Sequence, residues 1–183
     1  MAVRAGGSEP RPVHLVRDAL PRPPGGPGVS EADGIVTVIG IGNRFRRDDA
    51  AGLEVARSLR GRVDGDVRIV ELEGEPLDVL DIWTSADEVI VADAVTGAGE
   101  AGTVHLLSAS DARFPAPFRA KGTHTFSLAD VVELARATDR LPRSLVVYGI
   151  EGGDFSTGEG LTEPVARAVE ASAAAIARRV GRR

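Results

Sequence analysis

Two aspartates and one histidine have residue types and positions that could bind a metal ion or transfer a proton. Asp49 follows a hydrophobic run and a glycine-rich turn, Asp93 lies near the end of another hydrophobic run, and His124 follows a Gly-Thr pair. Two carboxylates and an imidazole can hold a metal ion and leave positions open for water or a substrate atom. Each residue also has an ordinary interpretation, in which Asp49 faces a helix N-terminus, Asp93 caps a loop and His124 is a structural loop residue.

The turn before Asp49 contains Gly40, Gly42 and Asn43. Because glycine has no side chain, a peptide or a phosphate can come close to the backbone at such a turn. A dinucleotide-binding fingerprint needs a third glycine where this chain has Phe45, and arginines beside that residue fill the place of a pyrophosphate. We therefore expect Gly40, Gly42 and Asn43 to contact a substrate peptide, and nucleotide binding remains an alternative.

Hydrophobic runs predict the strands that would bring these residues together. Residues 35–41 and Glu88–Val95 are apolar on both faces, which is typical of buried strands in a parallel sheet. A helix is predicted over residues 50–59, where apolar side chains recur at helical spacing. Asp49 and Asp93 then belong to the edge of the sheet at which open α/β folds carry their sites.

The remaining segments continue an alternation of strands and helices. We predict strands over residues 67–72, 103–107 and 145–150, helices over 128–138 and Glu163–Val180, a short helix from Pro76, and a loop over 111–121. Ser127 and Asp130 have the spacing of a capping box at the start of the helix over 128–138. His105 is expected to be a structural or surface residue of its strand. The alternation predicts a three-layer α/β/α sandwich with a mostly parallel central sheet.

Composition restricts the function classes. A length of 183 residues fits one domain, and a net charge of −5 argues against a general nucleic-acid binder. The absence of cysteine excludes disulfides, thiolate metal sites and a cysteine nucleophile. No apolar run approaches the roughly 18 residues of a membrane helix, and no signal peptide is recognisable. We expect a cytoplasmic protein that is a monomer and does not bind membranes.

The first 34 residues differ in composition from the rest. They hold six of the eleven prolines and a Gly-Gly pair, so they cannot bury enough apolar surface to offset the entropy of ordering. We expect a disordered tail over residues 1–34 and a single catalytic α/β domain over residues 35–183.

Several short motifs, taken in order, resemble the hydrogenase maturation endopeptidases. They are Gly40-Ile41-Gly42-Asn43 with Asp48-Asp49, Val91-Ala92-Asp93-Ala94, Gly102-Thr103-Val104, His124 with Ser127-Leu128, Gly149-Ile150-Glu151, and Leu161-Thr162-Glu163-Pro164-Val165. The resemblance extends from residue 35 to residue 180, and the combination is far more specific than any one motif.

The resemblance implies a fold, a reaction and a set of site residues. The fold is an α/β/α sandwich of the phosphorylase/hydrolase kind. The reaction is removal of a C-terminal extension from the large-subunit precursor of a [NiFe] hydrogenase, with nickel already held by the precursor as the recognition element. The metal-contacting residues correspond to Asp49, Asp93 and His124. Whether the metal or an aspartate activates the attacking water is left open.

One departure from the family pattern concerns the residues after Asp49. The family usually has glycine there, whereas this chain has Ala50 and Ala51 before Gly52. Alanine at position 50 would be strained at a positive φ and harmless in a helical conformation. A second hypothesis is therefore an assembly factor that binds the precursor without cutting it.

Overall fold

The computed structural model of the chain describes residues 35–63, 65, 67–83, 88–97, 99–108 and 127–181. The predicted tail over residues 1–34, the predicted loop over 111–121 and His124 lie outside these ranges. Within them, strands and helices follow one another in the order that the sequence predicts.

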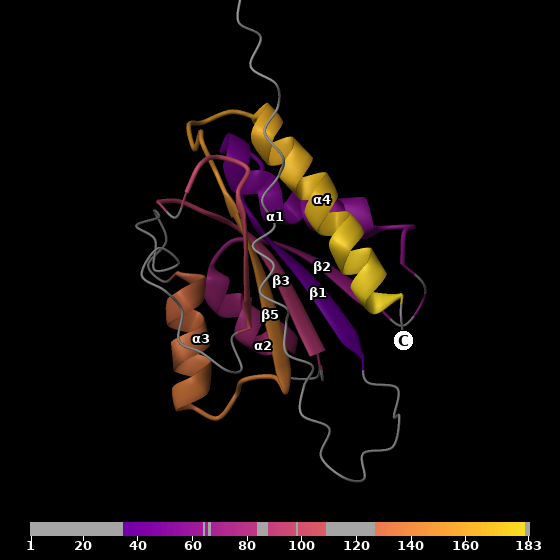
Figure 1. The fold of residues 1–183 in the computed structure, drawn as a ribbon. Coiled ribbons are helices and arrows are strands. Elements are labelled where there is room, and N and C mark those ends of the chain that lie inside the picture. Colours follow the sequence, from indigo (N-terminus) through magenta and orange to yellow (C-terminus); the bar gives the residue numbers. More distant parts are fainter. Residues whose placement is uncertain are drawn as a thin grey trace, which may run out of the picture.

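Five strands of the described residues form one sheet in the order β2-β1-β3-β5-β4 (Figure 1). They are β1 (Val36–Gly42), β2 (Val67–Glu73), β3 (Glu88–Val95), β4 (Val104–Ser108) and β5 (Ser144–Glu151). The first three and β5 are parallel, whereas β4 runs antiparallel to β5 at the edge of the sheet. The mostly parallel sheet is thus confirmed.

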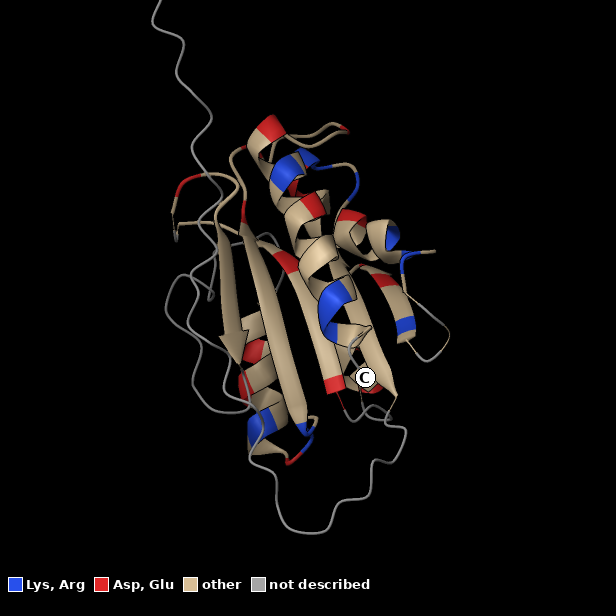
Figure 2. Ribbon diagram, turned by 45° about the vertical axis from the view of Figure 1, so that its right-hand side comes forward, with Lys and Arg blue, Asp and Glu red and all other residues tan. Residues whose placement is uncertain are grey.

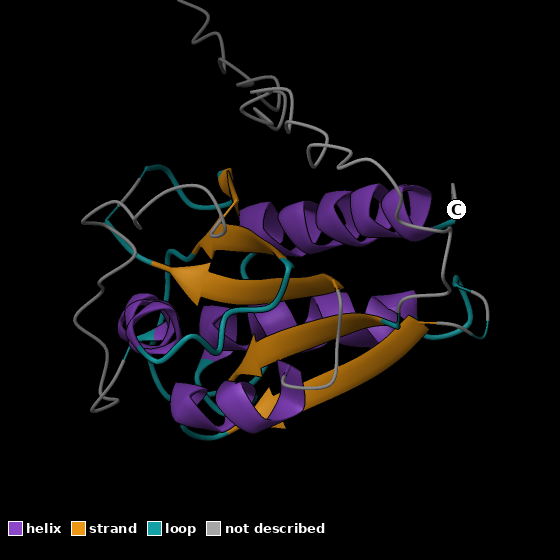
Figure 3. Cartoon of the chain, turned by 90° about the horizontal axis from the view of Figure 1, so that it is seen from below, coloured by secondary structure: helices purple, strands orange, loops and turns teal. Residues whose placement is uncertain are grey.

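Helices cover both faces of this sheet (Figure 3). On one face lie α1 (Ala51–Leu59) and α4 (Glu163–Val180), and on the other lie α2 (Val79–Trp83) and α3 (Leu128–Ala137). Two 3-10 helices, η1 (Arg47–Ala50) and η2 (Pro76–Asp78), lead into α1 and α2. The three-layer α/β/α sandwich predicted from the sequence is therefore confirmed.

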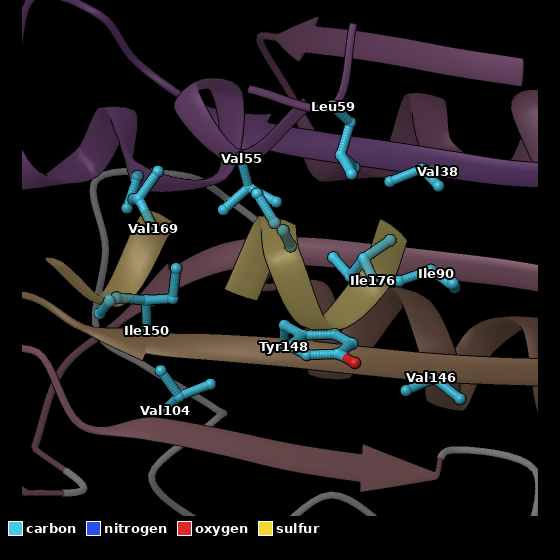
Figure 4. Packing of buried hydrophobic residues seen from close by; sticks show 14 of the residues in the cluster. Val38, Val55, Leu59, Ile90, Val104, Val146, Tyr148, Ile150, Val169 and Ile176 are labelled. Carbon is cyan, nitrogen blue, oxygen red and sulfur yellow. The ribbon is translucent and has the colours of Figure 1, made fainter. Parts of the chain in front are cut away.

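Each face of the sheet has its own apolar core. In the core under α1 and α4, Val55 and Ile176 from the helices meet Ile90 and Tyr148 from the strands (Figure 4). The other core contains Trp83, which is 1% exposed. Strands β1, β3 and β5 contribute side chains to both cores, which explains why their sequences are apolar without alternation.

The start of α3 has the predicted capping box. The backbone N–H of Asp130 donates to Ser127 Oγ at 3.2 Å, and the backbone N–H of Ser127 donates to Asp130 Oδ2 at 3.0 Å. These two bonds satisfy donors that a helix start otherwise leaves without partners, so they fix the residue at which α3 begins.

Charged residues of both signs lie on the outer surface of the helices. On the face shown in Figure 2, acidic and basic residues are interspersed along α4. No helix within the described ranges combines the length and the apolar character that crossing a bilayer requires.

Candidate active site

The topology brings the carboxyl ends of β1 and β3 together. The chain leaves β1 toward β2 on one side, and β3 pairs with β1 on the other side, so the order of strands reverses between them. Crevices at such switch points are where open α/β sheets bind their ligands. Asp49 lies on η1 directly after β1, and Asp93 lies near the carboxyl end of β3. Both predicted site residues therefore lie at the carboxyl ends of neighbouring strands.

The carboxyl groups of Asp49 and Asp93 interact electrostatically. Burial, together with the negative charge of Asp49, raises the pKa of Asp93 from 3.8 to about 7, although a hydrogen bond from the backbone of Ala94 opposes the shift. A carboxyl group that titrates near neutrality can accept a proton from water or bind a cation, which makes it typical of catalytic sites. Both residues are half-buried as a whole, whereas their carboxyl groups are more deeply buried: Asp49 Oδ2 is a buried atom, and desolvation is the main cause of the raised pKa of Asp93.

His124 lies outside the described residues, so its place beside the two aspartates stays a prediction. Among the residues that the structure does describe, no group of three or more histidine, cysteine, aspartate or glutamate side chains could hold a metal ion. The described part of the site is therefore a carboxylate pair.

Asp48 has a structural role that sequence reasoning missed. Its side chain is fully buried and accepts hydrogen bonds at 2.7–2.9 Å from the backbone N–H groups of Gly153, Asp154 and Thr162 and from the Thr162 hydroxyl. These bonds fasten η1 to the loop before α4. The signal was present in the Asp-Asp pair, because consecutive residues on a helix point in different directions and only one of them can face the site.

The glycines of the turn permit close packing of α1 on the sheet. A Cβ atom on Gly40 would lie 2.1 Å from the carbonyl oxygen of Gly52, and one on Gly42 would lie 2.0 Å from that of Asp49. Real Cβ atoms do not approach so closely, so both positions require glycine. These contacts hold η1 and α1 against β1 and thereby fix the position of Asp49.

Asn43 shapes the same turn with its side chain. Its Oδ1 accepts a hydrogen bond from the backbone N–H of Phe45 at 2.9 Å, and its own N–H donates to the carbonyl oxygen of Asp49 at 3.2 Å. Such a local bond is typical of asparagine at turns. The predicted contacts of Gly40, Gly42 and Asn43 with a substrate remain predictions beside these structural roles.

Comparisons with known proteins identify the family. The family model HycI, described as hydrogenase maturation protease, matches residues 53–179. The chain belongs to the hydrogenase maturation proteases. The hydrogenase 2 maturation protease of Escherichia coli K12 is 30% identical over 139 residues, which cover 74% of this chain and 84% of that protein.

Solved structures agree with the family assignment. The hydrogenase maturating endopeptidase HybD from Escherichia coli has a TM-score of 0.64 and 28% identity, covering 77% of this chain and 88% of its own. The [NiFe] hydrogenase maturation protease HycI from Thermococcus kodakarensis has a TM-score of 0.65 and 25% identity, covering 80% and 92%. This hydrogenase maturation protease is therefore a hydrolase, and the family favours an endopeptidase over the nucleotide-binding alternative.

The backbone of this maturation protease accommodates its departure from the family pattern. Ala50 has φ −78° and ψ −3°, and Ala51 has φ −55° and ψ −43°, so both lie in the helical region. Alanine is the best helix former, and neither residue is strained. The observation that suggested a non-cleaving assembly factor thus has a harmless explanation.

A further acidic residue, Glu151, lies at the carboxyl end of β5 and connects it to the neighbouring chain segments. Glu151 is 2% exposed, accepts a hydrogen bond from the backbone N–H of Gly97 at 2.5 Å, and lies 3.6 Å from His105 Nε2. Its contact with Gly97 holds the loop after β3 against the end of β5. His105 thus faces a buried carboxylate of β5, in agreement with the structural role expected of it.

Proposed function

We propose that this protease removes a C-terminal extension from the large-subunit precursor of a [NiFe] hydrogenase after nickel insertion. The observation that carries the proposal is the interacting pair of Asp49 and Asp93 at the switch point of the sheet, within a chain of the maturation protease family. The mixture of acidic and basic residues in Figure 2 supports a protein substrate rather than nucleic acid. We further propose that the enzyme acts as a monomer in the cytoplasm.

Nickel fits this site as a part of the substrate. The two carboxylates supply oxygen ligands, and His124 would add an imidazole nitrogen, but the chain contains no cysteine to add thiolates. Such a donor set is incomplete for nickel, so firm binding requires soft ligands from the precursor. The protease would then engage only precursors that already hold the metal.

His124 is proposed as the third contact on the basis of chain connectivity and the family motif. It precedes Ser127, the N-cap of α3, by three residues, a stretch that can span at most about 10 Å. Helix α3 covers the face of the sheet toward which Asp93 points, because Val91 and Val95, two residues away on either side, belong to the core under α2 and α3.

The raised pKa of Asp93 suggests how this chain would assist hydrolysis. In the metal-free protein the pKa of Asp93 is about 7, and whichever of the two carboxylates is not bound to nickel would take a proton from the attacking water. It can later return that proton to the leaving amine. Substrate-held nickel would polarise the scissile carbonyl or the water.

A cleavage assay tests the proposal. Purified protease is incubated with nickel-loaded and with nickel-free large-subunit precursor, and the intact mass of the large subunit is measured. We expect loss of the extension from the nickel-loaded form alone. Equal processing of both forms would refute nickel recognition, and processing of neither, while a known maturation protease cuts the same sample, would refute the activity.

The His124→Ala variant provides the matched control. We expect it to lose cleavage while its circular dichroism spectrum stays that of the wild type. Unchanged cleavage would exclude His124 from the site. Binding of the precursor by the wild type without any change of mass would instead support the assembly factor.

A further inference from the structure

Two loops at the carboxyl edge of the sheet are joined into one surface, which we call the two-loop platform and define as residues 43–47 and 152–160. The backbone N–H of Gly158 donates to the carbonyl oxygen of Phe45 at 2.8 Å, and that of Arg47 donates to the carbonyl oxygen of Gly158 at 2.9 Å. These bonds form a parallel bridge between segments that are far apart in the sequence.

Side chains strengthen the platform. The guanidinium of Arg46 donates to the carbonyl oxygen of Phe155 at 3.2 Å, and Arg47 Nε lies 3.3 Å from Asp154 Oδ2. Asp48 directly follows the first loop. Its buried carboxylate accepts hydrogen bonds from backbone N–H groups of the second loop. The platform is therefore held by backbone and side-chain bonds together, and its shape does not depend on a partner.

The platform also contains a strained backbone. Arg47 has φ +47°, in the left-handed region that residues other than glycine seldom adopt. Such conformations persist only where surrounding bonds enforce them, and they occur preferentially at functional sites. Here the backbone bonds between Gly158 and residues 45 and 47 enforce the conformation, and Phe45 lies two residues before Arg47 on the same turn.

Phe45 is 57% exposed, more than any other large hydrophobic residue of the described ranges. A single exposed apolar side chain is ordinary in itself. This one differs because it stands on a rigid turn that leads into η1, four residues before Asp49. A protein whose scissile bond reaches Asp49 and Asp93 must cover the surface beside Phe45.

Charged groups surround the exposed ring. Arg44, the preceding residue, donates from Nε to Glu73 Oε2 at 2.7 Å and makes a second contact with the same carboxylate. An exposed aromatic side chain with charged neighbours is typical of residues that become buried in protein–protein interfaces. Because the backbone that carries Phe45 is already held by hydrogen bonds, docking would not have to order this turn.

We propose that Phe45 is the anchor through which the two-loop platform docks on the folded body of the large-subunit precursor, entering an apolar pocket beside its nickel site. The proposal rests on the proposed function and adds a contact that selects the precursor. Phe45 serves binding, whereas Asp49 and Asp93 serve the chemistry.

The test compares Phe45→Ala and Phe45→Leu with Ile35→Ala. Ile35 is 53% exposed and precedes β1, so it lies at the amino ends of the parallel strands, away from the candidate site. Its variant controls for the loss of an exposed apolar side chain. Affinity for the nickel-loaded precursor from the same organism is measured by biolayer interferometry, and KM and kcat are measured from cleavage. Melting temperatures verify folding.

Truncation of an aromatic anchor typically weakens binding about 30-fold, and we expect Phe45→Ala to raise Kd and KM by about that factor. We expect kcat to change less than about twofold, because the anchor binds ground state and transition state alike. Phe45→Leu should retain part of the affinity, and Ile35→Ala should bind as the wild type does.

Each remaining outcome is decisive. Wild-type affinity of Phe45→Ala, an equal loss in Ile35→Ala, or a fall in kcat at constant KM would overturn the docking role. If the wild type binds the precursor but does not cut it, the proposed function fails, and the affinities of the variants still decide whether Phe45 is the anchor.

Discussion

At the scale of single residues, the two adjacent aspartates of η1 have opposite surroundings. Asp48 is saturated by hydrogen bonds from Gly153, Asp154 and Thr162, whereas Asp49 faces Asp93. Four hydrogen bonds hold the buried Asp48 carboxylate against the loop before α4, so it is not available to a substrate. Of the two, Asp49 is therefore the one to which the proposed chemistry is assigned, and Asp48 maintains its position.

The pKa of Asp93 predicts how stability depends on pH. An unfolded aspartate titrates near 3.8, but in the folded protein the pKa of Asp93 is about 7. Between these values the folded state binds more protons than the unfolded state, so the free energy of unfolding falls as pH rises from about 4 to about 7. The decrease from this group has an upper bound of about 4 kcal/mol.

Asp93→Asn removes this dependence. We expect the variant to match the wild type in stability near pH 4 and to exceed it above pH 7, as measured by urea denaturation at a series of pH values. The exposed residue Asp78 provides a control, since Asp78→Asn should keep the wild-type profile. An advantage of Asp93→Asn that is largest at acid pH would contradict the assigned cause.

The positions of Asp49 and Asp93 in the candidate site could be predicted from the sequence, because they follow from local patterns. Each comes after a run of apolar residues, and parallel strands bring their carboxyl ends to one edge. The Asp-Asp pair indicates that only one of the two faces the site, but which one was not predictable, because it depends on Gly153 and Thr162, which are more than one hundred positions away. His124 stays a prediction from its motif.

At the scale of elements, α1 lies close to the sheet because Gly52 allows it. A Cβ atom there would lie 2.2 Å from the carbonyl oxygen of Ala92 and 2.3 Å from that of Ile41, and both are backbone atoms that cannot move aside. Gly52 thus serves a helix–sheet contact.

Gly52→Ala should therefore destabilise the protein by about 3 kcal/mol, as expected for overpacking in a rigid site. Gly65 provides the matched control, because a Cβ atom there would meet nothing within 4 Å. Gly65→Ala should change stability by less than about 0.5 kcal/mol. The midpoints of urea denaturation measure both effects, and equal midpoints for the two variants would refute the contact.

The predicted elements agree with the structure where periodicity and capping signals coincide. Glu88–Val95, Glu163–Val180 and the start of α3 at its capping box are found as predicted. Strand β4 was predicted over residues 103–107, but its antiparallel direction was not predictable, since direction depends on the path of the connection to β5.

At the scale of the whole molecule, the two cores share one sheet. Trp83, the only tryptophan, belongs to the core under α2 and α3, and Tyr148, the only tyrosine, belongs to the core under α1 and α4. Because β1, β3 and β5 contribute to both cores, loss of one layer exposes the sheet that supports the other. The described α/β unit should unfold in one cooperative step.

Spectroscopy can follow the two layers separately. We expect tryptophan fluorescence, the near-ultraviolet signal of tyrosine and far-ultraviolet circular dichroism to give the same denaturation midpoint in urea. Exchange of Trp83 for phenylalanine isolates the tyrosine signal and should lower stability, because the indole is buried. Midpoints that differ between the layers would show that the cores unfold independently.

The contact between Gly52 and Ala92 has a consequence for synthesis of the enzyme. A ribosome delivers β1 and α1 well before β3, so Asp49 emerges without Asp93 and without the strand on which α1 finally rests. The carboxylate pair comes into existence only when β3 docks. If this pair performs the cleavage, as proposed, a chain that ends before β3 has no activity, and the order of the strands delays activity until the sheet has formed.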